Sequence, residues 1–314
     1  MSEHDPILVP LDGSDLAEQA VPVAVALAKK TGSELHLIHV HVPLAPEPIY
    51  VEGLPVIDAH MHSQRREHEQ AYLDGARLRL AAGARASTRV LDGAVASALG
   101  AHARESNAQL AVLTTHGRGG LERAWLGSVA DEMARVSPVP ILLVRPEPGE
   151  APARFRRLLV PLDGSPLAEA ILDHAIGIAR LDPEAEIVLL EVVQPVLSST
   201  LVPQSLLAPA SAKDEIKRAQ EAAAREYLEG VAGRVKSAHV RVRVRVDFSG
   251  NVAAAILEAA RAEGADLVAL CTHGRSGLRR LALGSVADKI VRASAIPVLL
   301  FRPPTGEASS ATRE

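Results

Sequence analysis

The sequence predicts two tandem α/β domains, each built on a doubly wound parallel sheet flanked by helices. Three observations support this fold class. The chain of 314 residues repeats its own motifs in order, each half alternates short apolar runs with helical stretches, and several apolar runs are continuous. Strands that alternate with helices form right-handed crossovers and hence a parallel sheet, and continuously apolar strands are those covered on both faces.

The repeat consists of three motifs that each occur twice. Residues 9–14 and 160–165 read VPLDGS, residues 115–118 and 272–275 read THGR, and residues 126–131 and 283–288 read LGSVAD. A chain of this length accommodates two domains of about 150 residues. Because the segment 146–152 is rich in proline and glycine, as a domain boundary is, we expect one domain over 1–146 and another over 153–304.

In the first half, apolar runs and the residues that interrupt them give the order of elements. Ile7 to Leu11 ends in Asp-Gly-Ser, which predicts a strand and a turn, and Ser14 or Asp15 then caps a helix that runs through Ala28. Four prolines in residues 43–55 predict a segment without regular structure. The other predicted strands are 34–42, 88–91, 110–115 and 140–144, and the other predicted helices are 60–82, 95–105 and 127–136.

The second half repeats this order. Its predicted strands are 158–162, 187–193, 240–248, 267–272 and 298–301. Residues 240–246 alternate valine with arginine, which is typical of a half-exposed strand whose charges discourage edge-to-edge aggregation. In an open parallel sheet, ligands bind beyond the carboxyl ends of the strands, where the strand order reverses. Because the repeated motifs all lie at those ends, we expect a binding site in each half.

Composition excludes several classes of protein. Hydrophobic residues make up 47% and charged residues 23%, which is typical of a globular chain, and the net charge of −4 argues against a globally basic nucleic-acid binder. A single cysteine, Cys271, excludes an internal disulfide and a multi-cysteine zinc site. The acidic start has no apolar leader and no apolar run reaches the roughly 18 residues of a spanning helix, so we expect no membrane association and a cytoplasmic location.

The segment after the fourth strand carries the strongest functional signal. Gly117 is followed by nine residues and then by Gly127 and Ser128 at the start of a helix, and Gly274 precedes Gly284 at the same spacing. The start of a helix presents free N–H groups and the positive end of the helix dipole, which together favour a phosphate. Glycine permits close approach, and a serine hydroxyl can bind the phosphate or a metal ion on it.

Acidic residues follow the first strand of each half. Asp12 and Asp163 can accept hydrogen bonds from ribose hydroxyls or an exocyclic amine, while Val40 and Val192 at the ends of the second strands offer an apolar wall to a base. Taken alone, Asp-Gly-Ser is better explained as an ordinary turn and helix cap. Its occurrence twice, together with the glycine motif at neighbouring strand ends, favours nucleotide binding.

These motifs resemble those of the universal stress proteins. VPLDGS, THGR, the Gly–nine residues–Gly-Ser-Val-Ala spacing and the run PVPILLV at 138–144 carry the resemblance, which covers both halves. The resemblance implies a five-stranded sheet of order 3-2-1-4-5 in each domain, pairing of the two domains through their fifth strands, and binding of ATP. Mg²⁺ or Mn²⁺ on the phosphates would be needed only for a bound triphosphate.

Carried over by position, the resemblance implies two sites. The first comprises Pro10, Leu11, Asp12, Val40, Leu113, Thr114, His116, Gly117, Gly127, Ser128 and Val129. The second comprises Pro161, Leu162, Asp163, Val192, Leu270, Cys271, His273, Gly274, Gly284, Ser285 and Val286. The family's motif has a glycine where this chain has Thr114 and Cys271, so we expect these side chains to narrow the site and weaken binding.

We therefore expect an ATP-binding stress-response or signalling protein. Two alternatives stay open, a slow nucleotide hydrolase and a protein-interaction module with vestigial pockets. The sequence has neither a Gly-x4-Gly-Lys-Ser/Thr phosphate loop nor a Gly-x-Ser-x-Gly elbow, so fast turnover is not indicated. Histidines gather between His36 and His68 but meet no spacing rule for a closed metal site, so no metal ligand is assigned. The protein partner and any pairing of whole chains stay unassigned.

Overall fold

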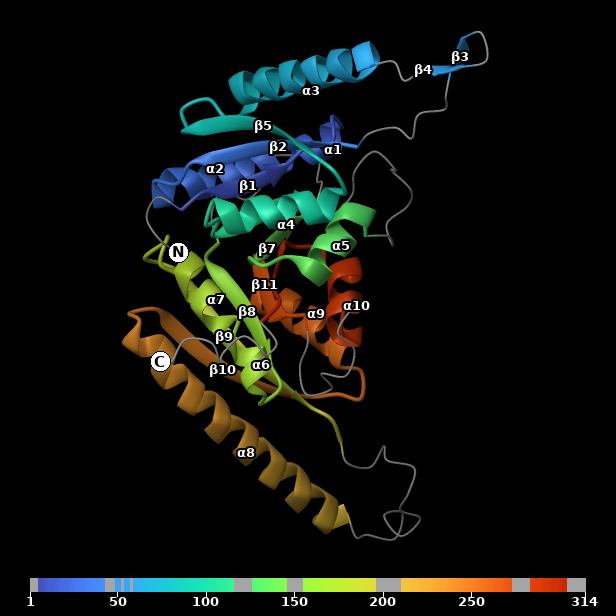
Figure 1. Ribbon diagram of the computed structural model, residues 1–314. Coiled ribbons are helices and arrows are strands. Elements are labelled where there is room, and N and C mark those ends of the chain that lie inside the picture. The colour runs from blue at the N-terminus through green and yellow to red at the C-terminus, as the bar shows by residue number, and fades with distance from the viewer. Residues whose placement is uncertain are drawn as a thin grey trace, which may run out of the picture. The chain divides into compact units, whose positions relative to one another are not determined.

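The computed structural model describes residues 5–42, 49–51, 54–56, 59–115, 126–145, 155–195, 210–272 and 283–303. The chain divides into two compact units, Met1–Ala153 and Arg154–Glu314, and each has the α/β fold (Figure 1). Among the helices of these described ranges, none is long and apolar enough to span a membrane.

In its described part, the first unit has a five-stranded parallel sheet. The strands are β1 (Ile7–Pro10), β2 (Leu35–His41), β5 (Ala86–Asp92), β6 (Leu110–Thr114) and β7 (Ile141–Val144). The helices are α1 (Asp15–Glu18), α2 (Ala20–Thr31), α3 (Ala59–Leu80), α4 (Val95–Glu105) and α5 (Ser128–Val136). The spatial order is β5-β2-β1-β6-β7, which confirms the predicted order 3-2-1-4-5 once the short hairpin between β2 and α3 is left aside.

The second unit repeats this arrangement in the residues described. Its strands are β8 (Arg157–Leu162), β9 (Glu186–Val193), β10 (Arg241–Phe248), β11 (Leu267–Cys271) and β12 (Val298–Phe301). Its helices are α6 (Pro166–Glu169), α7 (Leu172–Ala179), α8 (Ala210–Ser237), α9 (Val252–Glu263) and α10 (Ser285–Ala293). The order β10-β9-β8-β11-β12, with all neighbours parallel, is again 3-2-1-4-5.

Helices cover both faces of each sheet because the direction of travel reverses after the third strand. In the first unit α2 and α3 connect β1, β2 and β5 and pack on the sheet (Figure 1). After β5 the chain crosses back toward β6 and β7, and the helices of this return, α4 and α5, pack beside each other. Right-handed crossovers place these two pairs on opposite faces. The reversal leaves a switch point at the carboxyl ends of β1 and β6, and of β8 and β11 in the second unit.

The central strands form the core of each unit. Ile7, Leu8 and Val9 of β1 have no exposed surface, and neither do Leu158 and Leu159 of β8. Because aromatic residues are only 2% of the chain, aliphatic side chains fill the interior almost alone.

Two local predictions were wrong. Residues 43–55 were expected to lack regular structure, but Ile49–Val51 (β3) and Leu54–Val56 (β4) form an antiparallel hairpin in which Tyr50 lies opposite Pro55. A proline is tolerated in a two-stranded ribbon because each strand has a neighbour on one side only. The helix predicted to run unbroken to Ala28 is divided at Gln19, whose N–H bonds to the Leu16 carbonyl at 3.3 Å and so tightens the last turn of α1.

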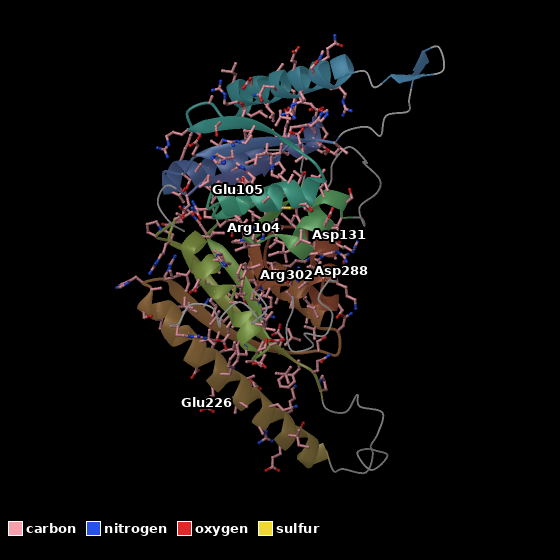
Figure 2. The ribbon with its side chains drawn as sticks, viewed as in Figure 1. Arg104, Glu105, Asp131, Glu226, Asp288 and Arg302 are labelled. Atoms are coloured by element: carbon pink, nitrogen blue, oxygen red, sulfur yellow. The ribbon has the colours of Figure 1, made fainter. Side chains whose placement is uncertain are left out.

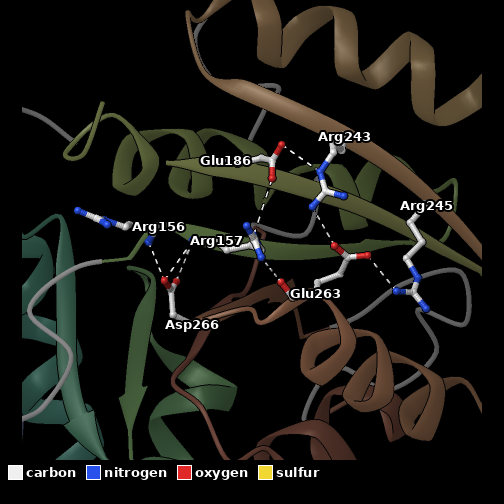
Figure 3. Close-up of polar contacts among 7 residues, drawn as sticks. All are labelled: Arg156, Arg157, Glu186, Arg243, Arg245, Glu263 and Asp266. Atoms are coloured by element: carbon white, nitrogen blue, oxygen red, sulfur yellow. Dashed lines mark hydrogen bonds and ion pairs between the residues drawn. The ribbon is translucent and has the colours of Figure 1, made fainter. Parts of the chain in front are cut away.

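The alternating strand β10 lies at the edge of its sheet, as predicted, and two of its arginines, Arg243 and Arg245, bind acidic side chains of the same unit (Figure 3). Arg243 contacts Glu186 at 3.0 Å and Glu263 at 2.9 Å. Arg245 reaches the same Glu263 at 2.9 Å. These arginines are therefore neutralised locally, and they protect the edge strand without forming an open basic surface.

A pair of histidines joins β2 to α4. His36 Nδ1 and His102 Nε2 are 3.0 Å apart, and His102 is 5% exposed. Burial lowers the pKa of both imidazoles, and proximity to His36 lowers the pKa of His102 further. As the pH falls, the unfolded chain therefore binds more protons than the folded chain. The stability contributed by this pair is complete above pH 6.5, the ordinary histidine pKa, and is lost as the pH falls below it.

We therefore expect the melting temperature of the protein to fall between about pH 7 and about pH 5, and we expect His102→Gln to reduce that fall. Gln cannot take up a proton, so the variant removes one of the two titrating groups. Thermal denaturation followed by circular dichroism across this range measures the effect. The control is His68→Gln, at an exposed histidine whose Nδ1 lies 3.2 Å from the Gln64 carbonyl oxygen. Equal slopes for both variants would contradict the assignment.

Candidate functional site

The turn after β1 fixes the first acidic residue of the predicted site. Asp12 Oδ1 accepts hydrogen bonds from the Ser14 N–H at 3.0 Å and the Ser14 hydroxyl at 2.6 Å. Gly13 has φ of 85°, a conformation that favours glycine, and Ser14 Oγ accepts from the Ala17 N–H at 3.1 Å and caps α1. Asp-Gly-Ser is thus a turn and a cap, and it holds the half-buried Asp12 at the carboxyl end of β1.

The second unit builds the same turn with nearly identical geometry. Asp163 Oδ1 accepts from the Ser165 N–H at 3.0 Å and the hydroxyl at 2.6 Å, while Gly164 has φ of 80°. Ser165 Oγ accepts from the Ala168 N–H at 3.2 Å, which caps α6. The carboxylate therefore has the same local support in both units.

The ends of the neighbouring strands supply apolar surface. Val40 of β2 is 9% exposed, Val192 of β9 is half-buried, and the residues that end β6 and β11 are buried. Those buried residues are Leu113, Thr114, Leu270 and Cys271. Pro10, Leu11, Pro161 and Leu162 belong to or directly follow β1 and β8. His116, Gly117, His273 and Gly274 lie outside the described residues.

The helices α5 and α10 begin beside these strand ends. The Gly127 N–H donates to the Thr115 carbonyl at 2.7 Å, and the Gly284 N–H donates to the Thr272 carbonyl at 2.9 Å. Each glycine is the residue that precedes its helix, so Ser128 and Ser285 are the first helical residues and are followed by Val129 and Val286. The start of each helix is therefore tied to the end of the strand that precedes it.

In both helices the N-cap position is a glycine, which makes no side-chain cap hydrogen bond. Gly127 and Gly284 both have φ of −59° and ψ of 146°. Any residue can adopt this backbone conformation, so the conformation itself does not demand glycine. A glycine N-cap leaves the first-turn amides without a cap from that residue, in contrast to α1 and α6, where a serine hydroxyl accepts from an amide of the first turn.

Charge inside these two helices is internally paired. Asp131 in the first turn of α5 contacts Arg135 at 2.8 Å, and Asp288 in the first turn of α10 contacts Arg292 at 2.9 Å. Figure 2 labels the two aspartates. An unpaired carboxylate in the first turn would compete with a phosphate for the positive end of the helix dipole. The i,i+4 pairing to arginine reduces that competition.

Sequence reasoning missed a polar cluster beside the second turn. The Tyr227 hydroxyl on α8 donates to Glu169 of α6 at 2.9 Å. Arg234, seven residues later on the same helix, forms an ion pair with the same carboxylate. Burial raises the pKa of Tyr227, and the hydrogen bond to Glu169 and the charge of Asp163 raise it further. The phenol is therefore a neutral hydrogen-bond donor within electrostatic reach of the site carboxylate.

The first unit has a cluster of the same three residue types, without the tyrosine hydrogen bond of the second unit. Arg79 contacts Glu18 of α1 at 2.8 Å, and Tyr72 on α3 lies beside that carboxylate. Burial raises the pKa of Tyr72, as do the charges of Glu18 and Asp12. The buried Tyr72 hydroxyl interacts with Glu18, which contributes to the raised pKa, but the contact does not reach the hydrogen-bond geometry of the equivalent tyrosine–glutamate pair in the second unit. The repeated Tyr-Leu-Asp/Glu-Gly, with arginine seven residues after the tyrosine, was the available sequence signal.

Histidines of β2 form a different polar group. His39 and His41 lie on one face of the strand, and both approach Glu69, at 3.6 and 2.8 Å respectively. His39 Nδ1 also lies 2.8 Å from the Leu11 carbonyl oxygen. Within the described ranges, no group of three or more His, Cys, Asp or Glu side chains is arranged to hold a metal ion.

Cys271 is buried next to the second site. It is 8% exposed, and burial raises the pKa of its thiol to about 12, with a further contribution from the charge of Asp163. We expect the thiol to resist alkylation, because only about one thiol in ten thousand is ionised at about pH 8. Ellman's reagent should report no fast reaction with the native chain and one thiol per chain in denaturant. Rapid reaction of the native protein would contradict this.

Comparison with known proteins gives a consistent result. The family described as "Universal stress protein family" matches residues 3–145 and again residues 154–302. A universal stress protein of Mycolicibacterium smegmatis is 28% identical over 95% of this chain and 97% of its own length. The protein YxiE of Bacillus subtilis, also a universal stress protein, is 31% identical over 44% of this chain and 97% of its own length. A crystal structure of a universal stress protein from Archaeoglobus fulgidus matches the fold with a TM-score of 0.64 and 17% identity, over 98% of this chain and 99% of that chain.

Proposed function

Because the chain belongs to the universal stress protein family, we propose that each of its domains binds an adenine nucleotide, with ATP as the principal ligand. The observation that carries this proposal is the pair of uncapped helix starts at Gly127 and Gly284, each tied to a strand end at the switch point of its sheet. Asp12 and Asp163 lie at the carboxyl ends of the adjacent central strands. Chemically, this arrangement provides a phosphate cradle beside a carboxylate.

The roles of the residues follow from their chemistry. The first-turn amides and the hydroxyls of Ser128 and Ser285 would hold phosphate oxygens, and Asp12 and Asp163 would accept from ribose hydroxyls. Val40 would offer an apolar wall to the base. Mg²⁺ or Mn²⁺ would enter on the phosphates of a triphosphate, which themselves supply oxygen ligands.

The proposal extends to the role of the whole chain. Nucleotide binding without fast turnover suits a stress-response or signalling module in the cytoplasm, where adenine nucleotides are abundant, acting on a protein partner. It includes pairing of the two domains through β7 and β12, whose residues 141–144 and 298–301 are uncharged. Thr114 and Cys271 would weaken the affinity relative to a glycine at the same positions.

Titration calorimetry of the full chain with ATP and with GTP tests the proposal, together with an assay for released ADP. We expect binding of ATP at two sites per chain, weaker binding of GTP, and no sustained ADP release. If ATP produces no heat while the chain forms a stable complex with another protein, an interaction module is the better account. Multiple turnovers that are abolished by Asp12→Ala and Asp163→Ala would instead identify a hydrolase.

A further inference from the structure

The cluster of tyrosine, glutamate and arginine occurs in both domains, on helices that otherwise differ. The helix α3 spans 22 residues and α8 spans 28. Each nevertheless presents a tyrosine and, seven residues later, an arginine to the glutamate that ends the first short helix of its domain. The carboxylates of Glu18 and Glu169 are 16% and 20% exposed, so both depend on protein partners for their charge.

Hydrogen bonds at the two ends of the short helix α6 link this cluster to the site in the second domain. The Tyr227 hydroxyl donates to Glu169 at 2.9 Å, and Glu169 is the last residue of α6. That helix begins at the cap made by Ser165, whose hydroxyl accepts from the Ala168 N–H at 3.2 Å and donates to Asp163 at 2.6 Å. Because α6 has only four residues, a constraint on Glu169 is also a constraint on the turn that carries Asp163.

The first domain contains the same contacts except for the hydrogen bond from the tyrosine. Ser14 donates to Asp12 at 2.6 Å and caps α1 through the Ala17 N–H at 3.1 Å, and Glu18 ends that four-residue helix. Arg79 holds Glu18 at 2.8 Å, with the buried Tyr72 hydroxyl alongside. The two domains therefore share the same arrangement of tyrosine, glutamate and arginine. They differ in that the tyrosine hydroxyl forms its hydrogen bond to the glutamate in the second domain and not in the first.

We propose that Tyr72 and Tyr227 are positioning residues for the nucleotide sites, acting through Glu18 and Glu169 to hold the turns that carry Asp12 and Asp163 in the orientation that receives ribose hydroxyls. This inference rests on the proposed function. The tyrosines do not contact the ligand. Their contribution is to reduce the motion of a four-residue helix, and with it the cost of ordering the carboxylate when the ribose binds.

The double variant Tyr72→Phe/Tyr227→Phe tests this inference, because phenylalanine keeps the ring packing and removes only the hydroxyl. Calorimetry is carried out with ATP and with 2′,3′-dideoxy-ATP, which lacks both ribose hydroxyls. The comparison separates a loss of carboxylate positioning, which affects ATP alone, from a general loosening of the site, which affects both ligands. Because Tyr227 forms the hydrogen bond and Tyr72 does not, we expect the second site of the double variant to bind ATP about tenfold more weakly than in the unsubstituted chain, and the first site to lose less. For dideoxy-ATP, the same substitutions should change the affinity by less than about twofold, because the positioned carboxylates have no hydroxyl to receive.

Equal losses with the two ligands, or no loss with ATP, would overturn the inference while leaving nucleotide binding intact. Failure of the unsubstituted chain to bind ATP would overturn the proposed function and this inference with it. The matched control is Thr88→Val, which removes the 2.7 Å hydrogen bond from β5 to Asp74 on α3 and loosens that helix without touching Tyr72. It should leave the affinity for both ligands unchanged.

Discussion

Replacing Gly127 and Gly284 together by alanine is expected to weaken ATP binding about 100-fold, a loss of about 2.7 kcal/mol per site, while both domains stay folded. The backbone at these positions, with φ of −59° and ψ of 146°, is accessible to alanine, so the substitution introduces no backbone strain. In the proposed site, the added methyl groups would stand where phosphate oxygens approach the amides. Calorimetry gives the affinity, and thermal denaturation monitors the fold.

The matched control makes the same chemical change elsewhere. Gly230 and Gly233 lie on α8, and a Cβ at either position would meet no heavy atom within 4 Å. Gly230→Ala/Gly233→Ala should leave the ATP affinity unchanged and raise the stability slightly, since alanine favours a helix over glycine. Unaltered ATP binding by the Gly127→Ala/Gly284→Ala variant would show that phosphate does not bind at the helix starts.

Truncating the centre of the second core is expected to have the largest effect on stability. Leu159 has no exposed surface and pairs with Val188 of β9 on one side and Val268 of β11 on the other. Leu159→Ala should lower the free energy of unfolding of that domain by about 2–5 kcal/mol, because a close-packed aliphatic interior closes only partly around the cavity. Denaturant unfolding measures this loss.

Leu8→Ala in β1, the equivalent position of the first domain, should produce a loss of similar size there. Leu167 is 37% exposed on α6, so Leu167→Ala serves as the control and should change the stability by no more than about 0.5 kcal/mol. If Leu159→Ala costs no more than this control, the assignment of β8 to the centre of the core is wrong.

The sequence was sufficient to predict the strands, their parallel arrangement and the duplication, because apolar runs such as Leu158–Leu162 and repeated motifs are local signals. It was also sufficient to predict an acidic turn and a glycine-started helix in each half. The hairpin at Ile49–Val51 was missed because four prolines dominate that segment and the strands are only three residues long. Short strands carry too little periodicity to outweigh proline.

The link between Tyr227 and Glu169 could not be predicted, although its residues are repeated in the chain. The two side chains are separated by 58 residues, and no spacing rule connects the third helix of the unit to its first. Only the packing of α8 and α6 brings them together. The glycine-started helices could likewise be suspected from Gly127-Ser128, but only the structure shows that Gly127 is the N-cap and Ser128 the first helical residue.

Native mass spectrometry of the full chain, incubated with excess ATP and then freed of unbound ligand, tests the central claim most directly. Two adenine nucleotides per chain are expected, and Gly127→Ala/Gly284→Ala should remove both. A mass equal to that of the polypeptide alone, with no adenine compound released on denaturation, would contradict nucleotide binding at these helix starts.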